Sequence, residues 1–209
     1  KSFLTKVKEV TSEDQKAEKL RLSAAVFYTH ITNAIVRIDY QLNGQDSLLY
    51  DGELARIQTN SNAANAFIYG GTGEVKVGFS PTFNLKTSLT YTFGENITNG
   101  TPLGHIPPLY GRTSINMVRK KWNVSLYSVY NGSKLAVEYS PTGEDNLNEG
   151  TDNGTPAWYT VNIKGVWHVK ENVQVQFGLQ NILDHHYKQF ASGISAPGRG
   201  ASVTVRANL

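Results

Sequence analysis

Apolar and polar side chains alternate at every second position along most of this chain. In residues 85–93, for example, Leu85, Leu89 and Tyr91 fall on one side of an extended backbone and Lys86 falls on the other. A period of two predicts β-strands rather than helices. The same alternation recurs in 20–29, 74–79, 111–118, 122–130, 159–169, 173–180 and 201–209. We therefore expect about eight strands of roughly ten residues, a length that crosses a lipid bilayer at a tilt.

The connections between these strands alternate between short and long. Short turns are expected at 80–84, 119–121 and 170–172, and long polar loops at 37–63, 95–109, 132–156 and 190–199. Outer-membrane β-barrels have short turns on the periplasmic side and long loops on the extracellular side. A soluble β-sandwich gives no reason for sorting loop length by side. We expect the four long loops to lie outside the cell.

The two faces of the predicted strands differ as a transmembrane barrel requires. Lys86, Lys164 and Arg206 all stand opposite the apolar positions. Aromatic residues gather near strand ends, where interfacial girdles form; they are Phe79, Phe93, Trp122, Tyr130, Tyr159 and Trp167. A half-buried soluble sheet produces similar alternation and is the alternative. The pattern predicts an all-β fold, an antiparallel transmembrane β-barrel, in residues 19–209, preceded by a lead-in strand and turn in residues 1–18.

Composition is consistent with this fold and narrows the function. The mean hydropathy of the 209 residues is -0.35, and no apolar run reaches the roughly 18 residues of a membrane-spanning helix. Lumen-facing polar residues lower the mean hydropathy of a barrel in this way. The net charge of +3 is spread along the chain, which argues against a nucleic-acid partner, and the absence of cysteine excludes disulfides and thiolate metal sites. The chain begins at Lys1 without an initiator Met, so we expect a mature form or a piece of a longer protein.

Four segments carry a resemblance to a known family. NILDHHY (181–187), then PGR (197–199) and a last alternating strand, resemble the C-terminal end of TonB-dependent outer-membrane receptors. FYTHITNAIV (27–36) resembles the family's strand that rises into a long extracellular loop, and NAFIYGGTGEVKVGF (65–79) resembles the returning strand. PLGHIPPLYGRTSI (102–115) resembles the segment that re-enters the barrel.

The resemblance implies that the chain forms about eight C-terminal strands of a barrel of about 22 strands. Such receptors bind a scarce, bulky nutrient (a ferric siderophore, haem, cobalamin or a glycan) and import it with TonB-coupled energy. The expected partners are outer-membrane lipid, a metal chelate or other small nutrient, a surface lipoprotein, and the TonB complex. Contact with TonB would run through an N-terminal plug that nothing in this sequence resembles. No cofactor, resident metal or nucleic acid is expected.

The candidate ligand-binding residues are polar and aromatic side chains at the predicted extracellular ends of strands. They are His105, Tyr110, His185, His186, Tyr187 and Arg199. Metal binding by the adjacent His185 and His186 is disfavoured, because neighbouring residues of a strand point to opposite faces. Asp184 and Arg199 suggest an ion pair or hydrogen bond at the barrel rim rather than a contact with substrate.

The sequence shows no catalytic signature of the common hydrolase or metalloprotease types, so we do not expect an enzyme. Two alternatives to the receptor hypothesis stay open at this point. One is a small structural or adhesive outer-membrane barrel without transport, and the other is a soluble β-sandwich that binds a partner.

Overall fold

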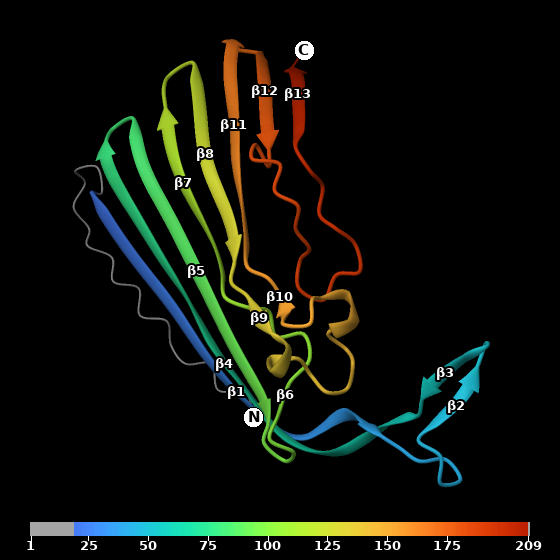
Figure 1. Ribbon diagram of the computed structural model, residues 1–209. Helices are drawn as coiled ribbons and strands as arrows, with labels where there is room; N and C mark the ends of the chain where they lie inside the picture. The colour runs from blue at the N-terminus through green and yellow to red at the C-terminus, as the bar shows by residue number, and fades with distance from the viewer. Residues whose placement is uncertain (1–18, 209) are drawn as a thin grey trace.

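The computed structural model describes residues 19–208, and most of them belong to one curved antiparallel sheet (Figure 1). The sheet runs in chain order through β1 (Leu20–Asp39), β4 (Gln58–Ser80), β5 (Phe83–Asn96), β7 (Tyr110–Val118), β8 (Trp122–Asn131), β11 (Trp158–Lys170), β12 (Val173–Gln180) and β13 (Gly200–Ala207). Each strand pairs antiparallel with the next along this path. The predicted all-β antiparallel fold is confirmed, and the predicted lead-in strand and turn lie in residues 1–18, outside the described part.

The smaller elements all belong to the connections. β6 (Thr101–Pro102) pairs with the end of β5, β2 (Ser47–Tyr50) pairs with β3 (Glu53–Arg56), and β9 (Lys134–Leu135) pairs with β10 (Gly154–Thr155). Two single-turn 3-10 helices, η1 (Ala136–Glu138) and η2 (Leu147–Glu149), complete the list. Among residues 19–208 no helix is long and apolar enough to cross a membrane.

Short and long connections are sorted to opposite ends of the sheet, as the sequence predicts. The turns at 81–82, 119–121 and 171–172 lie together at the upper end in Figure 1, and the loops at 40–57, 97–109, 132–157 and 181–199 lie at the lower end. We call these the turn end and the loop end. The β2–β3 hairpin projects from the loop end away from the sheet.

The expected boundaries of two loops are wrong. The predicted loop at 37–63 is shorter, because β1 and β4 are 20 and 23 residues long and stay paired as far as Asp39 and Gln58. Outside a bilayer, pairing needs only backbone hydrogen bonds, so polar residues extend the strands without alternation. The loop expected at 190–199 begins earlier, at 181, because Asn181 and Asp184 adopt φ values of +46° and +53° that end β12.

The strand register places the predicted lipid-facing side chains on a single face. One row of directly paired apolar residues crosses six strands; it consists of Val77, Leu85, Ile115, Leu126, Ile163 and Leu179. The neighbouring positions form polar rows, such as Lys86, Ser114, Tyr127 and Asn162. A hollow of about 650 Å³ is lined largely by polar-face residues, among them Asn84, Asn116 and Gln176. The polar face is therefore the concave, lumenal one.

Aromatic rings mark both ends of the apolar face. At the loop end the rings of Phe67, Tyr69 and Phe93 pack with centroids 5.3 to 6.0 Å apart. At the turn end Trp122 and Trp167 are directly opposite each other and half exposed. Tyr130 lies on the same face of β8, and eight residue steps of about 3.3 Å each separate it from Trp122 by roughly 26 Å along the strand. This matches the apolar band of about 25 Å that outer-membrane barrels present to lipid.

Candidate functional site

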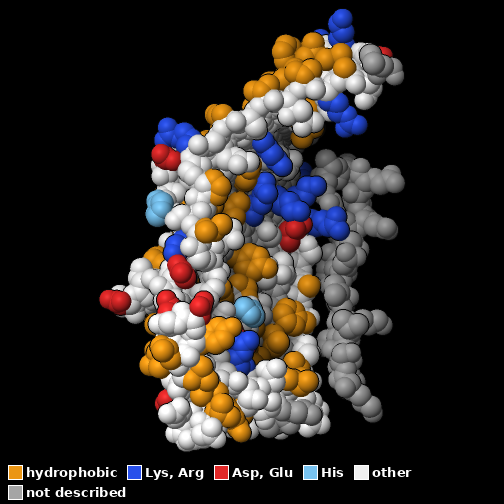
Figure 2. Space-filling model, turned by 90° about the vertical axis from the view of Figure 1, so that its right-hand side faces the viewer, with side chains coloured by type: hydrophobic (Ala, Val, Ile, Leu, Met, Phe, Trp, Pro, Cys, Tyr) orange, Lys and Arg blue, Asp and Glu red, His pale blue; other side chains and the backbone are white. Residues whose placement is uncertain are grey.

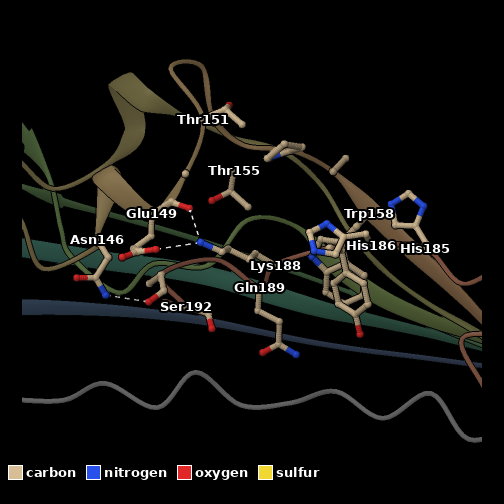
Figure 3. Close-up of a pocket in the computed structure, with 15 residues that line it drawn as sticks. Asn146, Glu149, Thr151, Thr155, Trp158, His185, His186, Lys188, Gln189 and Ser192 are labelled. Carbon is tan, nitrogen blue, oxygen red and sulfur yellow. Dashed lines mark hydrogen bonds and ion pairs between the residues drawn. The ribbon is translucent and has the colours of Figure 1, made fainter. Parts of the chain in front are cut away.

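The loop end contains a cavity of about 290 Å³ that lies between the loops 132–157 and 181–199, beside the first residue of β11 (Figure 3). Its lining includes Trp158, His185, His186, Tyr187 and Lys188. Loops that meet at one end of a rigid sheet are common binding regions, because the scaffold holds them in place.

The loop 181–199 owes its shape to Asn181, which is buried. The Asn181 Oδ1 accepts the backbone N–H of His185 at 2.9 Å, and its Nδ2 donates to the carbonyls of His185 at 2.9 Å and Pro197 at 3.4 Å. The backbone N–H of Asn181 donates to the Oδ1 of Asn162 on β11 at 2.9 Å. Asn181 thus links the segment with the two histidines to the sheet through its backbone, and to the far end of the loop through its side chain.

Asp184 fixes the end of the same loop. Its Oδ1 accepts the backbone N–H of Arg199 at 2.7 Å. A Cβ atom on Gly198 would lie only 2.9 Å from that oxygen, so glycine suits this position. The expected rim contact between Asp184 and Arg199 is a hydrogen bond to the backbone of Arg199. The segments NILD and PGR therefore shape the loop.

The wall of the cavity is aromatic. The rings of Trp158 and Tyr187 stack with centroids 4.1 Å apart and planes 28° apart. Trp158 is only 7% exposed, and its Nε1 is buried without a hydrogen-bond partner among residues 19–208. A buried donor without an acceptor is costly, by about 1–3 kcal/mol, and native structures contain few of them.

The rim of the cavity joins its two loops. Lys188 Nζ donates to the carboxylate of Glu149 at 2.9 Å and to the carbonyl of the same residue at 3.2 Å. Asn146 Nδ2 donates to the carbonyl of Ala191 at 2.9 Å (Figure 3). The ion pair neutralises the formal charges of the rim, which leaves amides, hydroxyls and rings as the groups that face the cavity.

A second junction, behind the cavity, brings in a third loop. The buried carboxylate of Asp145 accepts the backbone N–H of His105 at 2.7 Å and that of Ser140 at 2.9 Å. Lys134 is buried nearby with its Nζ 5.6 Å from the ring centroid of Phe190. Burial lowers the pKa of Lys134, and the carboxylates of Glu138 and Asp145 partly oppose this shift. The loops 97–109, 132–157 and 181–199 therefore pack as one unit.

The six candidate residues divide into two groups. His185, His186 and Tyr187 line the cavity, and the two histidine rings lie apart in Figure 3. The ring of His185 stacks on that of Tyr159, with centroids 5.8 Å apart.

The other three candidates, His105, Tyr110 and Arg199, are not in its lining. His105 exposes 71% of its side chain beside Asp145, Tyr110 begins β7 on the polar face, and Arg199 is exposed just before β13. A role in ligand binding stays a prediction for all six.

Sequence reasoning missed Trp158, Glu149 and Lys188 as members of the site. The sequence does carry a signal for Trp158. Trp158, Thr160 and Asn162 are spaced two residues apart, so this large aromatic residue shares the polar face of β11 and lies at the loop end of the strand. Nothing in the sequence marks Glu149 and Lys188 as partners. Within residues 19–208 no group of three or more His, Asp or Glu side chains is placed to hold a metal ion.

Comparison with known protein families shows which family the chain belongs to. The sequence model described as "TonB dependent receptor-like, beta-barrel" matches residues 9–182. The chain belongs to the TonB-dependent receptor family. The resemblance to this family is thereby confirmed, and the chain is a part of the receptor's β-barrel.

Solved structures share the fold of this receptor chain. They include the copper transporter OprC (TM-score 0.74, 17% identity, 92% of this chain and 29% of that one). The siderophore receptor PiuA from Acinetobacter baumannii has a TM-score of 0.61 and 20% identity, over 90% of this chain and 26% of that one. A variant of the ferric enterobactin receptor PfeA from Pseudomonas aeruginosa has a TM-score of 0.65 and 16% identity, over 92% of this chain and 29% of that one. The receptor chain thus spans less than a third of the length of these structural relatives. No curated protein sequence compared with it gives a match.

Proposed function

We propose that this chain forms part of the barrel of an outer-membrane receptor that captures a scarce, bulky nutrient at its outer mouth and imports it with energy relayed through TonB. The observation that carries the proposal is the cavity at the loop end, walled by Trp158 and Tyr187 and held by the Lys188–Glu149 ion pair. A cavity at this end faces the exterior when the short turns face the periplasm.

The chemistry of the cavity favours a ligand with flat surfaces and several hydrogen-bonding groups. Its rings offer stacking, its amide and hydroxyl groups offer neutral hydrogen bonds, and its one ion pair is already closed. A ferric siderophore, haem, cobalamin or the end of a glycan would each meet these conditions. The relatives named for copper and for ferric enterobactin agree with a chelated metal as cargo, the metal arriving with the ligand.

The assembly needed for this function extends beyond the chain. Within residues 19–208 the sheet path ends at β1 and at β13 without a further paired strand, and lipid cannot satisfy unpaired backbone groups, so we infer that further strands close the barrel. We assign the remaining strands, the plug and the TonB contact to the rest of the receptor, with outer-membrane lipid around the apolar face and a surface lipoprotein as a further candidate partner at the loops.

Uptake measurements test this function directly. The complete receptor is expressed in cells with and without TonB, and accumulation is measured for a panel of labelled ferric siderophores, haemin, cobalamin and oligosaccharides. We expect one member of the panel to accumulate only when TonB is present. Accumulation that is independent of TonB, or none from any member, would contradict the proposal.

The same panel locates the ligand site. Trp158→Phe keeps an aromatic ring but removes the buried indole N–H, so affinity for the accumulated ligand should fall about tenfold, the effect of one lost hydrogen bond. Tyr159→Phe is the matched control, because Tyr159 follows Trp158 in β11 and lies on the opposite, outward face of the sheet. This variant should leave the affinity unchanged. Equal affinities for the two variants would remove Trp158 from the site.

A further inference from the structure

Basic side chains gather at the turn end of this sheet, whereas most carboxylates lie at the loop end. Arg119, Lys120 and Lys121 form the turn between β7 and β8, and Lys170 ends β11 at the next turn along the sheet. Within the described part of the chain, Glu171 is the one carboxylate of the turn end. Figure 2 shows this sorting on the face that it views, with Lys and Arg more frequent towards the top, the turn end, and Asp and Glu mostly below. The turn end therefore carries a net positive charge.

The strand register places one of these cations on the apolar face. The outward residues of β7 are Ile115 and Met117, and the alternation continues to Arg119. The backbone N–H of Arg119 donates to the carbonyl of Trp122 at 2.9 Å, so these two residues face each other across the turn. Trp122 is in turn directly opposite Trp167 on β11. A guanidinium and two indole rings thus form one row on the face that meets lipid.

The turn between β11 and β12 adds a second cation to the same face. The register shifts after His168, and Lys170 is then directly opposite Val173 of β12. Val173 lies on the outward face, as does Val175, the partner of Trp167. Neighbouring strands are about 4.8 Å apart, so β7 and β11, with β8 between them, hold their cations roughly 10 Å apart across the sheet. That separation is close to the width of one phospholipid headgroup.

These cations have no anionic partner among the residues that the structure describes. None of the four enters an ion pair there, and all four are exposed. The rings beside them are accessible as well, since Trp122 is 41% exposed and Trp167 is 51% exposed. Interfacial tryptophans lie at the depth of lipid headgroups, and Lys and Arg side chains beside them extend their charged ends towards the headgroup phosphates.

We propose that Arg119, Lys120 and Lys170, together with Trp122 and Trp167, bind the headgroup of an anionic phospholipid in the periplasmic leaflet. That leaflet of an outer membrane consists of phospholipids, and the anionic ones carry a phosphodiester without an ammonium group to neutralise it. Clusters of Lys and Arg next to a membrane-spanning segment attract such lipids. The inference rests on the proposed function only in that the turn end faces the periplasm, and it holds whichever nutrient is imported.

The position of the row favours a lipid over a periplasmic protein. Arg119 shares the outward face with Trp122 and Trp167, at the edge of the apolar band, so lipid surrounds it on that side. A protein that approaches along the barrel axis meets the tip of the turn instead. Lys121 is not assigned to the site, because its carbonyl accepts the backbone N–H of His168, a residue of the lumenal register.

Photo-crosslinking from a position beside the site tests the proposal. Phe83 is directly opposite Met117 on the outward face, and it is replaced by p-benzoylphenylalanine in the complete receptor. The receptor is placed in phosphatidylcholine vesicles that contain a trace of alkyne-labelled phosphatidylglycerol or, in a parallel sample, phosphatidylethanolamine with the same acyl chains. We expect phosphatidylglycerol to be crosslinked about tenfold more, since each exposed and screened cation contributes a few-fold preference.

Variants of the three cations show whether charge is the cause. Arg119→Gln combined with Lys120→Gln and Lys170→Gln should bring the yield for phosphatidylglycerol down to that for phosphatidylethanolamine. Exchanging Arg for Lys and Lys for Arg at the same three positions keeps the charge and should keep most of the preference. Raising NaCl to about 1 M should lower the preference of the parent receptor and change the Gln variant little.

A matched control removes the same charge from the other face. Lys76, Lys86 and Lys164 lie on the lumenal face, so their combined replacement by Gln should leave the crosslinking ratio unchanged. Heat-modifiable migration on gels confirms that each barrel is folded.

Several results would overturn the inference. Equal yields from the two lipids in the parent receptor would do so, as would an equal loss of preference in the lumenal control. A preference that excess soluble glycerol phosphate abolishes would assign the cations to a soluble anion. An unchanged preference in the Gln variant, with weaker TonB-dependent uptake, would assign the turn end to a periplasmic protein. If the parent receptor shows no TonB-dependent uptake but keeps a lipid preference that the Gln variant loses, the proposed function fails while the lipid site stands.

Discussion

Two glycines on the apolar face lie beneath aromatic rings from the neighbouring strand: Gly111 beneath Tyr130, and Gly165 beneath Phe177. Gly165 has the closer ring and gives the stronger test of how this sheet packs. Gly165 on β11 is directly opposite Phe177 on β12, and the ring of Phe177 lies over it. A Cβ atom added at Gly165 would lie 2.2 Å from Cζ and 2.6 Å from Cε1 of Phe177. Gly165→Ala must therefore displace the whole ring, because these separations are far below van der Waals contact.

The cost of this change follows from two opposed effects. Overpacking a tight site costs typically about 1–3 kcal/mol, while replacing glycine in a strand interior gains roughly 0.5–1 kcal/mol from reduced backbone freedom in the unfolded chain. We expect Gly165→Ala to lower the free energy of unfolding by about 1–2 kcal/mol. Phe177→Val removes the ring, so combining it with Gly165→Ala should give a loss at least 1 kcal/mol smaller than the sum of the two single losses.

Urea unfolding of the complete receptor in phosphatidylcholine vesicles, followed by tryptophan fluorescence, measures these differences. Gly73→Ala is the matched control, since Gly73 lies on the same face of β4 and a Cβ atom there has no neighbour within 4 Å. That variant should be as stable as the parent or slightly more stable. If Gly165→Ala and Gly73→Ala unfold at the same urea concentration, or if Phe177→Val brings no relief, the packing argument is wrong.

Three further predictions follow from the faces, the ends and the loops of the sheet. Leu126→Arg, midway between the aromatic rings on the apolar face, should cost roughly 2–4 kcal/mol in vesicles, and Ser125→Arg, on the lumenal face, close to nothing; equal costs would mean that the faces are wrongly assigned. Cysteine at Gly193, in a long loop, should react with an impermeant thiol reagent on intact cells, whereas cysteine at Glu171, in a short turn, should react only after lysis. Because burial lowers the pKa of Lys134 below its usual 10.5, the folded loops bind that proton less readily than the unfolded chain. The stability of the loops should therefore rise as pH increases through the folded-state pKa towards 10.5, and the rise should be smaller in Lys134→Met, measured as the pH dependence of hydrogen exchange in the loops.

The faces and ends of the sheet could be predicted from the sequence because both depend on short-range rules. Side chains alternate between the two faces of any strand, so Leu126 and Ile163 share a face whichever partners their strands find. Turn and loop lengths are read directly from the spacing between alternating segments. The closing motif at Asn181 was recognisable by its resemblance to the family, although its role as a structural centre of hydrogen bonds was visible only in the fold.

The strand ends beyond the bilayer were not predictable in this way. Residues 58–66 are rich in Asn, Ser and Ala and show no apolar alternation, yet the first of them pair with the end of β1. Pairing there depends on backbone hydrogen bonds, which any sequence without proline can make. The site was hidden for a related reason, since Lys188 and Glu149 lie 39 residues apart and meet only because two loops end beside β11.

The sequence by itself determined that this chain forms antiparallel strands with one apolar and one polar face, and that long loops gather at one end. Those features follow from local periodicity and from the chemistry that lipid demands of each face. Only the tertiary structure decided that Trp158 stacks on Tyr187, that Asp145 joins two loops, and that Lys76 on β4 lies directly opposite Lys86 on β5. Such contacts depend on strand register and loop closure, which bring together residues far apart in the chain, and no local pattern encodes which of them will meet.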